Sequence, residues 1–121
     1  MSKRILAIED HAENRRILRL LLASGGYEML EAVTGEEGVA MAEKERPDLI
    51  LMDIQLPGLD GYEATRRIKA NPAIRHIPII VVTSYALSGD DVKAFEAGCD
   101  AYVTKPFVPR ELLAKVREYV P

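Results

Sequence analysis

The sequence alternates short apolar runs with segments of helical periodicity, and this alternation constrains the fold more than any other feature. Each run suits a strand and is too short for a typical helix. The runs are Ile5–Ile8, Tyr27–Ala32, Leu49–Met52, Ile77–Val82 and Ala101–Val103. Strands that alternate with helices are typical of a parallel sheet covered by helices on both faces. We therefore expect an α/β fold.

Helical spacing of apolar residues and helix-boundary residues predict one helix after each strand. The helices are expected from Asn14 to Ala23, from the N-cap Thr34, from Asp60 to about Lys69, from Ser88 to Ala97 and from Pro109 onward. Thr34 with Glu37 forms a capping-box pattern. In the helix that ends at Ala97, Val92 and Phe95 are expected to contact the core.

The strands differ in polarity, which predicts their order in the sheet. Tyr27–Ala32 carries two glutamates and Ala101–Val103 is very short, so these two are expected at the edges. The other three are almost wholly apolar, as central strands are. The resulting order 2-1-3-4-5 is that of a doubly wound (βα)5 flavodoxin-like sandwich, with its topological switch point between the first and third strands.

Composition and charge exclude several classes of protein. The chain has 121 residues and 48% hydrophobic content, so residues 1–121 suit one domain with its own core. Its single cysteine excludes an internal disulfide framework. The net charge is −3 and the basic residues are scattered, which argues against nucleic-acid binding. Only four apolar residues follow Lys3 and Arg4, too few for a signal peptide or a membrane span, so we expect a soluble, cytoplasmic protein.

Polar residues stand where four of the predicted strands end. Glu9 and Asp10 follow the first strand, Asp53 the third, Thr83 the fourth and Lys105 the fifth. In open parallel sheets, the carboxyl ends of the strands meet at one edge and the binding crevice lies at the switch point. These side chains are therefore expected to converge.

Three carboxylates in one crevice favour either protonation or a bound cation, because two unit charges about 4 Å apart repel by roughly 4 kcal/mol at an effective dielectric constant near 20. An all-oxygen set suits Mg²⁺. Zinc is not expected, because His11, His76 and Cys99 show no ligand spacing. Asp53 is placed to act as a nucleophile that forms an aspartyl phosphate.

Taken together, these motifs resemble the receiver domain of bacterial two-component response regulators, and the resemblance covers the whole chain. It rests on Glu9-Asp10, Asp53 with the Pro57–Gly61 turn, Thr83, Tyr102 and Lys105-Pro106. In length the chain is similar to the single-domain chemotaxis and cell-cycle regulators. Its Asp53–Pro57 segment is similar to that of the cell-cycle regulators.

The resemblance implies that Asp53 accepts a phosphoryl group from a phosphohistidine of a sensor kinase or histidine phosphotransfer protein. It implies that Asp10 and Asp53 bind Mg²⁺ directly, Glu9 through water and Gln55 through its backbone carbonyl, and that Mn²⁺ can substitute. The domain would catalyse its own phosphorylation and dephosphorylation without being an enzyme for a separate substrate.

The resemblance also implies a switch. Lys105 would pair with the phosphoryl oxygens, and the Lys105–Pro106 bond would be cis. Thr83 would move toward the phosphoryl group while Tyr102 changes rotamer, which would remodel the surface of the fourth helix, fifth strand and fifth helix for an unknown downstream protein.

Other positions qualify these roles. Glu9 replaces an aspartate that is frequent in the family. Gln55 and Tyr85 lie two residues beyond Asp53 and Thr83, where they influence the lifetime of the phosphorylated state, and we expect Tyr85 to slow hydrolysis. Phe107 and Pro109 suit either a docking surface for the phosphodonor or, in the case of Phe107, the core.

Alternatives remain at this stage. The chain would also suit a receiver module of a larger multidomain regulator or hybrid kinase, and homodimerisation stays open. An aspartyl-nucleophile hydrolase similar to the haloacid dehalogenases would need Asp-x-Asp where Glu9-Asp10-His11 stands. A flavodoxin-like cofactor module would need a phosphate-binding loop where residues 11–14 stand.

Overall fold

The computed structural model describes residues 2–84 and 89–121. Within these residues, five strands form one parallel sheet of order β2-β1-β3-β4-β5, which confirms the predicted flavodoxin-like order. The strands are β1 (Arg4–Ile8), β2 (Glu28–Ala32), β3 (Leu49–Met52), β4 (Ile79–Thr83) and β5 (Ala101–Thr104). The helices are α1 (Ala12–Ser24), α2 (Gly35–Glu45), α3 (Gly61–Ala70), α4 (Asp90–Ala97) and α5 (Pro109–Tyr119).

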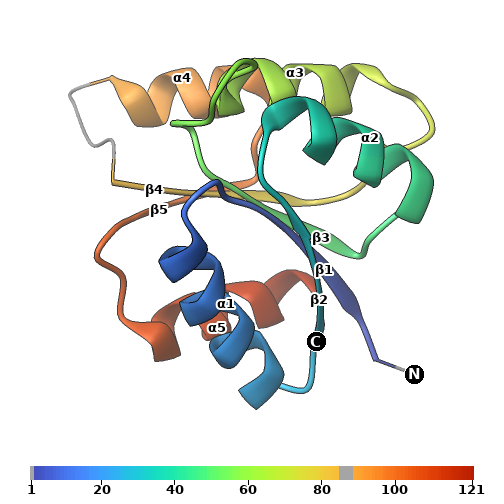
Figure 1. Cartoon of the computed structure of the whole chain (residues 1–121). Coiled ribbons are helices and arrows are strands. Elements are labelled where there is room, and N and C mark those ends of the chain that lie inside the picture. Colours follow the sequence, from blue (N-terminus) through green and yellow to red (C-terminus); the bar gives the residue numbers. More distant parts are fainter. Residues whose placement is uncertain (1, 85–88) are drawn as a thin grey trace.

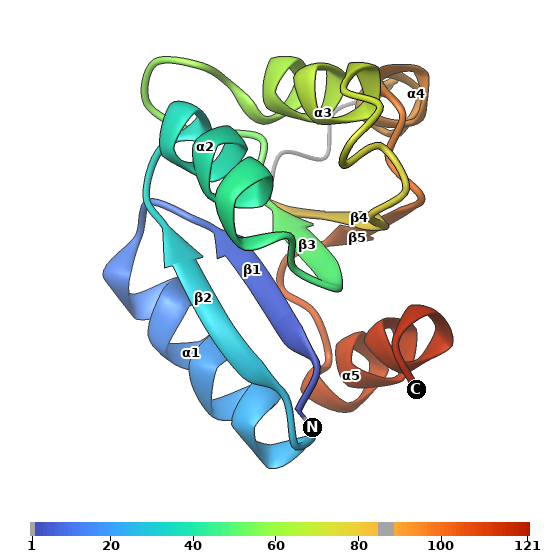
Figure 2. The same ribbon diagram turned by 90° about the vertical axis from the view of Figure 1, so that its right-hand side faces the viewer.

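The helices form a layer on each side of the sheet. Helices α1 and α5 cover one face, and α2, α3 and α4 cover the other (Figure 1). A view turned by 90° shows the same two layers with the sheet between them (Figure 2). Two groups of buried apolar residues fill the spaces on either side of the sheet. The described helices include none with the length and apolar character needed to cross a membrane.

The central strands are buried on both faces, and their hydrogen bonds continue one residue past their ends. Residues 5–8 and 49–52 are almost completely inaccessible to solvent. Beyond the paired strand ends, the backbone N–H of Asp53 donates to the carbonyl of Ile8 over 3.0 Å. The N–H of Glu9 donates to the carbonyl of Ala32, also over 3.0 Å. The backbone that carries both acids is therefore fixed by the sheet.

Local sequence signals explain most helix starts. The side chain of Thr34 accepts a hydrogen bond from the N–H of Glu37 at 3.0 Å, and that of Asp60 accepts one from Glu63 at 2.9 Å. The reciprocal capping-box bond differs from the pattern, because the Glu37 carboxylate accepts from the N–H of Val33 at 2.7 Å. Gly58 has a φ of 71°, as a type II turn requires at its second central position.

Some sequence-based expectations were wrong. Val92 and Phe95 on α4 are about half exposed, at 53% and 50%, whereas Ala94 and Ala97 are buried. The small alanines let α4 pack closely against α3 and β5, and the larger side chains of Val92 and Phe95 therefore face outward. Strand β4 begins at Ile79, two residues later than expected. The expected helix start at Ser88 lies outside the described residues.

Gly61 provides a close contact that joins α3 to the end of β3. A Cβ atom at this position would lie 2.1 Å from the carbonyl oxygen of Asp53 and 2.7 Å from Cα of Ile54. Both are backbone atoms and cannot move aside easily. The N–H of Gly61 also donates to the carbonyl of Ile54 at 2.9 Å.

We predict that Gly61→Ala lowers the free energy of unfolding by about 1–3 kcal/mol, because the added methyl group overlaps backbone. Helix propensity alone would favour alanine by about 1 kcal/mol, so the sign of the change tests the contact. Urea unfolding followed by circular dichroism measures it. Lys44→Ala, at an exposed position of α2, should change stability by no more than about 0.5 kcal/mol. A Gly61→Ala protein as stable as the wild type would contradict the prediction.

Candidate functional site

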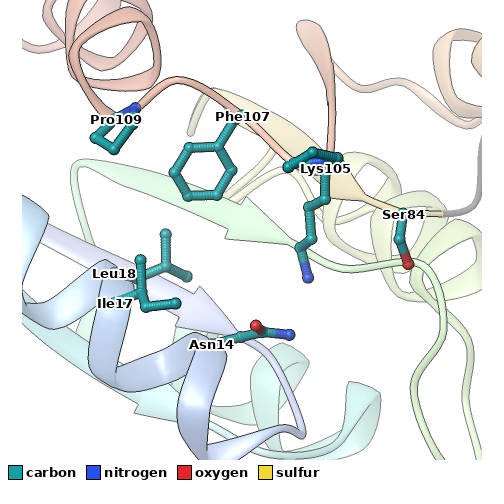
Figure 3. Close-up of a pocket in the computed structure, with 8 residues that line it drawn as sticks. Asn14, Ile17, Leu18, Ser84, Lys105, Phe107 and Pro109 are labelled. Atoms are coloured by element: carbon teal, nitrogen blue, oxygen red, sulfur yellow. The ribbon is translucent and has the colours of Figure 1, made fainter.

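An apolar pocket opens beside Lys105 at the carboxyl edge of the sheet. Its volume is about 510 Å³. Ile17 and Leu18 of α1 line one side, and Phe107 and Pro109 line the other (Figure 3). Phe107 packs partly against the core between α1, α5 and the sheet, and its part in docking a phosphodonor stays a prediction.

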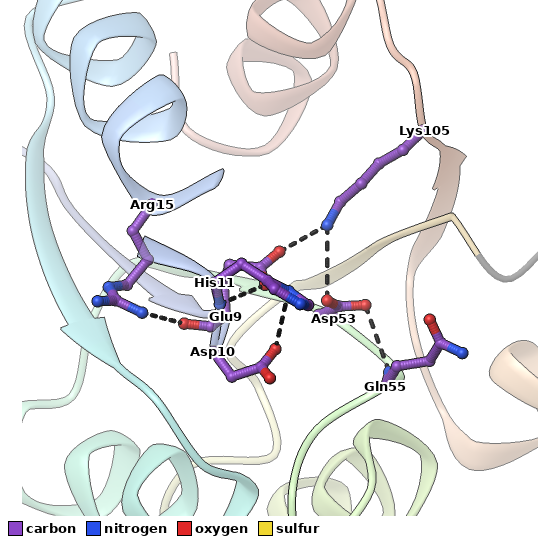
Figure 4. Close-up of polar contacts among 7 residues, drawn as sticks. All are labelled: Glu9, Asp10, His11, Arg15, Asp53, Gln55 and Lys105. Atoms are coloured by element: carbon purple, nitrogen blue, oxygen red, sulfur yellow. Dashed lines mark hydrogen bonds and ion pairs between the residues drawn. The ribbon is translucent and has the colours of Figure 1, made fainter. Parts of the chain in front are cut away.

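The predicted polar residues converge next to this pocket. Glu9 and Asp10 directly follow β1, Asp53 directly follows β3 and Lys105 directly follows β5. Figure 4 shows their side chains pointing toward one another. Glu9 and Asp53 are buried, with 2% and 5% of their surface exposed. Two ionisable side chains are thus held away from water, which charged groups tolerate only with suitable partners.

Lys105 links the two buried carboxylates. Its Nζ lies 2.5 Å from Oε1 of Glu9 and 3.5 Å from Oδ2 of Asp53. Because the Lys105–Glu9 contact is the shorter, the ammonium group serves mainly as the partner of Glu9. Asp53 receives a weaker share of the positive charge, and its Oδ1 lies 3.4 Å from the backbone N–H of Gln55.

The pKa values of the two acids move in opposite directions. Burial by itself raises the pKa of Glu9, but hydrogen bonds from Lys105 and the backbone N–H of His11 outweigh it and lower the value to about 2. Burial, followed by the negative charge of Glu9, raises the pKa of Asp53. The site is therefore short of positive charge at Asp53.

Asp10 carries an orphaned acceptor. Its Oδ1 atom is buried and has no hydrogen-bond partner among the described residues. Nδ1 of His11 lies 3.2 Å away, close enough for an ion pair but without hydrogen-bond geometry. A buried carboxylate oxygen without a donor is a suitable cation ligand. Glu9, Asp10, His11 and Asp53 each offer a ligand atom, all within 4.8 Å of one another. The donor set therefore fits a divalent cation.

Two residues at the site were missed from the sequence. His11 places Nδ1 3.1 Å from Oε2 of Glu9, although its spacing matches no metal motif. Arg15 of α1 donates from Nη1 to the backbone carbonyl of Glu9 at 3.0 Å, and its Nε lies 3.3 Å from the carboxylate of Glu31. The contacts of Arg15 depend on how α1 packs beside β1 and β2, whereas His11 reaches Glu9 from only two residues away and matches no known metal motif.

The remaining predicted residues lie around the same edge. Thr83 is completely buried at the end of β4. Tyr102 on β5 is half-buried and packs on the side of the sheet covered by α2, α3 and α4. Burial, and then the negative charges of Asp90 and Asp91, raise the pKa of its hydroxyl. The Lys105–Pro106 peptide bond is cis, as the resemblance implied. Tyr85 lies outside the described residues, so its role stays a prediction.

Comparison with known proteins decides the family. The family model described as "Response regulator receiver domain" matches residues 5–117. The chain belongs to this family. The comparison confirms the resemblance found in the sequence, and receiver domains of two-component response regulators act in phosphorelay signalling.

Relatives of this receiver domain match it over nearly their whole length. The polar-differentiation response regulator DivK of Brucella anthropi is 38% identical, over 99% of this chain and 98% of its own. A protein described as a response regulator from Chloroflexus aurantiacus has a TM-score of 0.94 and 32% identity, with 99% of this chain and 98% of its own covered.

A receiver domain attached to a sensor kinase is equally similar. The receiver domain of a sensor histidine kinase from Pseudomonas aeruginosa has a TM-score of 0.92 and is 39% identical, with 99% of this chain and 98% of its own covered. That structure has a magnesium ion coordinated in the active site cleft. Sequence identity therefore does not separate a free-standing regulator from a kinase-attached receiver.

We predict that Lys105→Met raises the pKa of Glu9 well above about 2. Burial of Glu9 remains in this variant, while its shortest contact with a cation is lost. A titration of the side-chain carboxyl ¹³C resonance of Glu9 measures the change. Lys115→Met removes the same charge from α5 away from the site and should leave the pKa of Glu9 at its wild-type value.

The same shift has a consequence for stability. Because the folded pKa of Glu9 lies below its ordinary value of 4.5, its ionisation stabilises the fold above about pH 4.5. That contribution disappears as the pH falls toward 2.

An unchanged Glu9 titration in Lys105→Met would show that the lysine does not set the pKa of Glu9.

Proposed function

We propose that residues 1–121 form one receiver domain that accepts a phosphoryl group on Asp53 from a phosphohistidine of a sensor kinase or histidine phosphotransfer protein. One observation carries this assignment: the Asp53 carboxylate stands at the end of the buried strand β3, beside Lys105 and within the acidic cluster. Three carboxylates without cations repel one another in this crevice. Lys105 and a divalent cation would offset that repulsion and would also stabilise the negative charge of a phosphoryl group on Asp53.

The transfer exchanges one bond for another. An oxygen of the Asp53 carboxylate attacks phosphorus, and a P–O bond forms as the P–N bond to the donor histidine breaks. The electron pair of the broken bond returns to the imidazole, which takes up a proton. Lys105 would move from Asp53 to a phosphoryl oxygen, and the hydroxyl of Thr83 would donate a hydrogen bond to another. These residues would catalyse both the phosphorylation of Asp53 and the later hydrolysis of the acyl phosphate, in which water takes the phosphoryl group and the carboxylate is regenerated.

Asp10, Asp53 and the backbone carbonyl of Gln55 would hold Mg²⁺, with Glu9 acting through water. When bound, the ion neutralises negative charge on the carboxylates and the phosphoryl oxygens. Support comes from the buried, unpartnered Oδ1 of Asp10 and from the magnesium-bound Pseudomonas relative. Mn²⁺ has similar ligand preferences and would substitute.

Phosphorylation would be read by a downstream protein on the face formed by α4, β5 and α5. Added charge at Asp53 would draw Thr83 toward the phosphoryl group and favour a different rotamer of Tyr102. Val92 and Phe95 of α4 already expose apolar surface there, which suits a protein partner. The expected place of action is the cytoplasm.

The phosphodonor would dock at the apolar pocket between α1 and the segment that joins β5 to α5. Ile17 is 47% exposed there and lies close enough to Lys105 to line the same pocket. A donor helix seated on Ile17, Phe107 and Pro109 would bring its phosphohistidine toward the acidic cluster. Apolar contacts next to the reacting groups would position the donor without altering the chemistry.

We predict that acetyl phosphate with Mg²⁺ adds one phosphoryl group to the wild-type protein and none to Asp53→Asn. Intact mass spectrometry measures the addition directly. Wild-type protein that binds Mg²⁺ but gains no mass would contradict the phosphoacceptor function. Addition to the Asp53→Asn protein would contradict the choice of residue.

We predict that Ile17→Asp slows phosphoryl transfer from a phosphorylated histidine phosphotransfer protein by about tenfold or more, because it places a charge in the apolar pocket. Its labelling by acetyl phosphate should be unchanged, since the small donor needs no docking surface. Val92→Asp introduces the same charge on the opposite side of the sheet and serves as the control. Equal slowing with both donors would show that Ile17 affects the site itself rather than docking.

A further inference from the structure

His11 holds an imidazole nitrogen among the carboxylates of the acidic cluster. Its Nδ1 lies 3.1 Å from Oε2 of Glu9 and 3.2 Å from Oδ1 of Asp10 (Figure 4). The ring is 64% exposed, so its other nitrogen, Nε2, can carry a proton that faces water. With the proton on Nδ1 the ring donates to Glu9; with the proton on Nε2 the lone pair of Nδ1 faces the carboxylates and can bind a cation.

The spacing of these atoms matches the ligands of one ion. Two ligands at right angles around an ion, each about 2.1–2.2 Å away, are about 3.0–3.1 Å apart. The 3.2 Å distance from Nδ1 of His11 to Oδ1 of Asp10 is close to this value.

On the other side of the cluster, the ammonium group of Lys105 already supplies a positive charge. Lys105 binds Oε1 of Glu9 and approaches Oδ2 of Asp53. Oε2 of Glu9 accepts a hydrogen bond from the backbone N–H of His11 at 3.0 Å, whereas the buried Oδ1 of Asp10 has no hydrogen-bond donor among the described residues. Nδ1 of His11 lies 3.2 Å from this unpartnered oxygen, so a cation bound to Oδ1 of Asp10 would be within reach of Nδ1 as well.

We propose that Nδ1 of His11 is a nitrogen ligand of the divalent cation held by this cluster. The inference rests on the cation site of the proposed function and adds a ligand and an ion class to it. Imidazole nitrogen suits first-row transition ions such as Co²⁺ and Zn²⁺, whereas Mg²⁺ prefers oxygen. His11 therefore shifts the selectivity of the site away from Mg²⁺ and toward transition ions.

Calorimetric titration with Mg²⁺ and with Co²⁺ tests the shift in selectivity. We expect His11→Ala to weaken Co²⁺ binding by about tenfold or more and to weaken Mg²⁺ binding far less. The side chain of His11 makes no capping hydrogen bond to α1, so the substitution should leave the fold intact. His11→Asn keeps a side chain that can donate to Glu9 and should show the same loss of Co²⁺ preference. His76→Ala, which removes the other histidine at an exposed position, is the matched control.

A second measurement observes the ligand directly. Zn²⁺ should shift the Nδ1 resonance of His11 in the ¹⁵N-labelled full chain and leave the ring of His76 unchanged. With only two histidines in the chain, the His76→Ala variant assigns the signals. Unshifted His11 resonances at saturating Zn²⁺, or equal weakening of Mg²⁺ and Co²⁺ in His11→Ala, would overturn the proposal.

The outcome is distinguishable from failure of the proposed function. If wild-type protein binds Mg²⁺ and gains a phosphoryl group on Asp53 while His11→Ala keeps the wild-type ratio of Co²⁺ to Mg²⁺ affinity, only the role of His11 is wrong. If wild-type protein neither binds Mg²⁺ nor gains mass with acetyl phosphate, the cation site and both proposals are wrong.

Discussion

The contact of Lys105 with the buried carboxylates of Glu9 and Asp53 is the interaction on which the rest of the site depends. One ammonium group lies close to Glu9 and farther from Asp53, which leaves Asp53 with too little positive charge for its burial. A buried charge without a partner of opposite charge destabilises the fold. The same imbalance suits the crevice to a divalent cation and to the negatively charged group that the cation would help to hold.

The sheet maintains this unfavourable arrangement of charges. Strands β1 and β3 are buried on both faces, and their hydrogen bonding extends to the N–H groups of Glu9 and Asp53. The close approach of Gly61 to the backbone at Asp53 fixes the following turn as well. Around this rigid edge, the two faces of the sheet differ: the apolar pocket lies by α1 and α5, whereas Tyr102 packs on the side of α2, α3 and α4. In the proposed function, Asp53 would connect the docking pocket with the face that the downstream protein reads.

Much of the fold and most of the site followed from the sequence because their signals are local. Apolar runs predicted the strands, and their polarity predicted the order, since edge strands tolerate glutamates that central strands do not. Residues that follow parallel strands lie at one edge of the sheet, and the strand order therefore predicted that Glu9, Asp10, Asp53 and Lys105 converge. Helix ends followed from Thr34 and other capping residues, whose bonds span only a few positions.

The sequence by itself determined the strands, their order and the acids at their ends, because each depends on composition or on neighbours along the chain. Tertiary packing alone decided which side of α4 faces inward, where close contact favoured Ala94 over Phe95. It also decided that Arg15 reaches the carbonyl of Glu9. Those contacts depend on the rotation of a helix about its axis and on its distance from the sheet, and both are set by side chains far apart in the sequence.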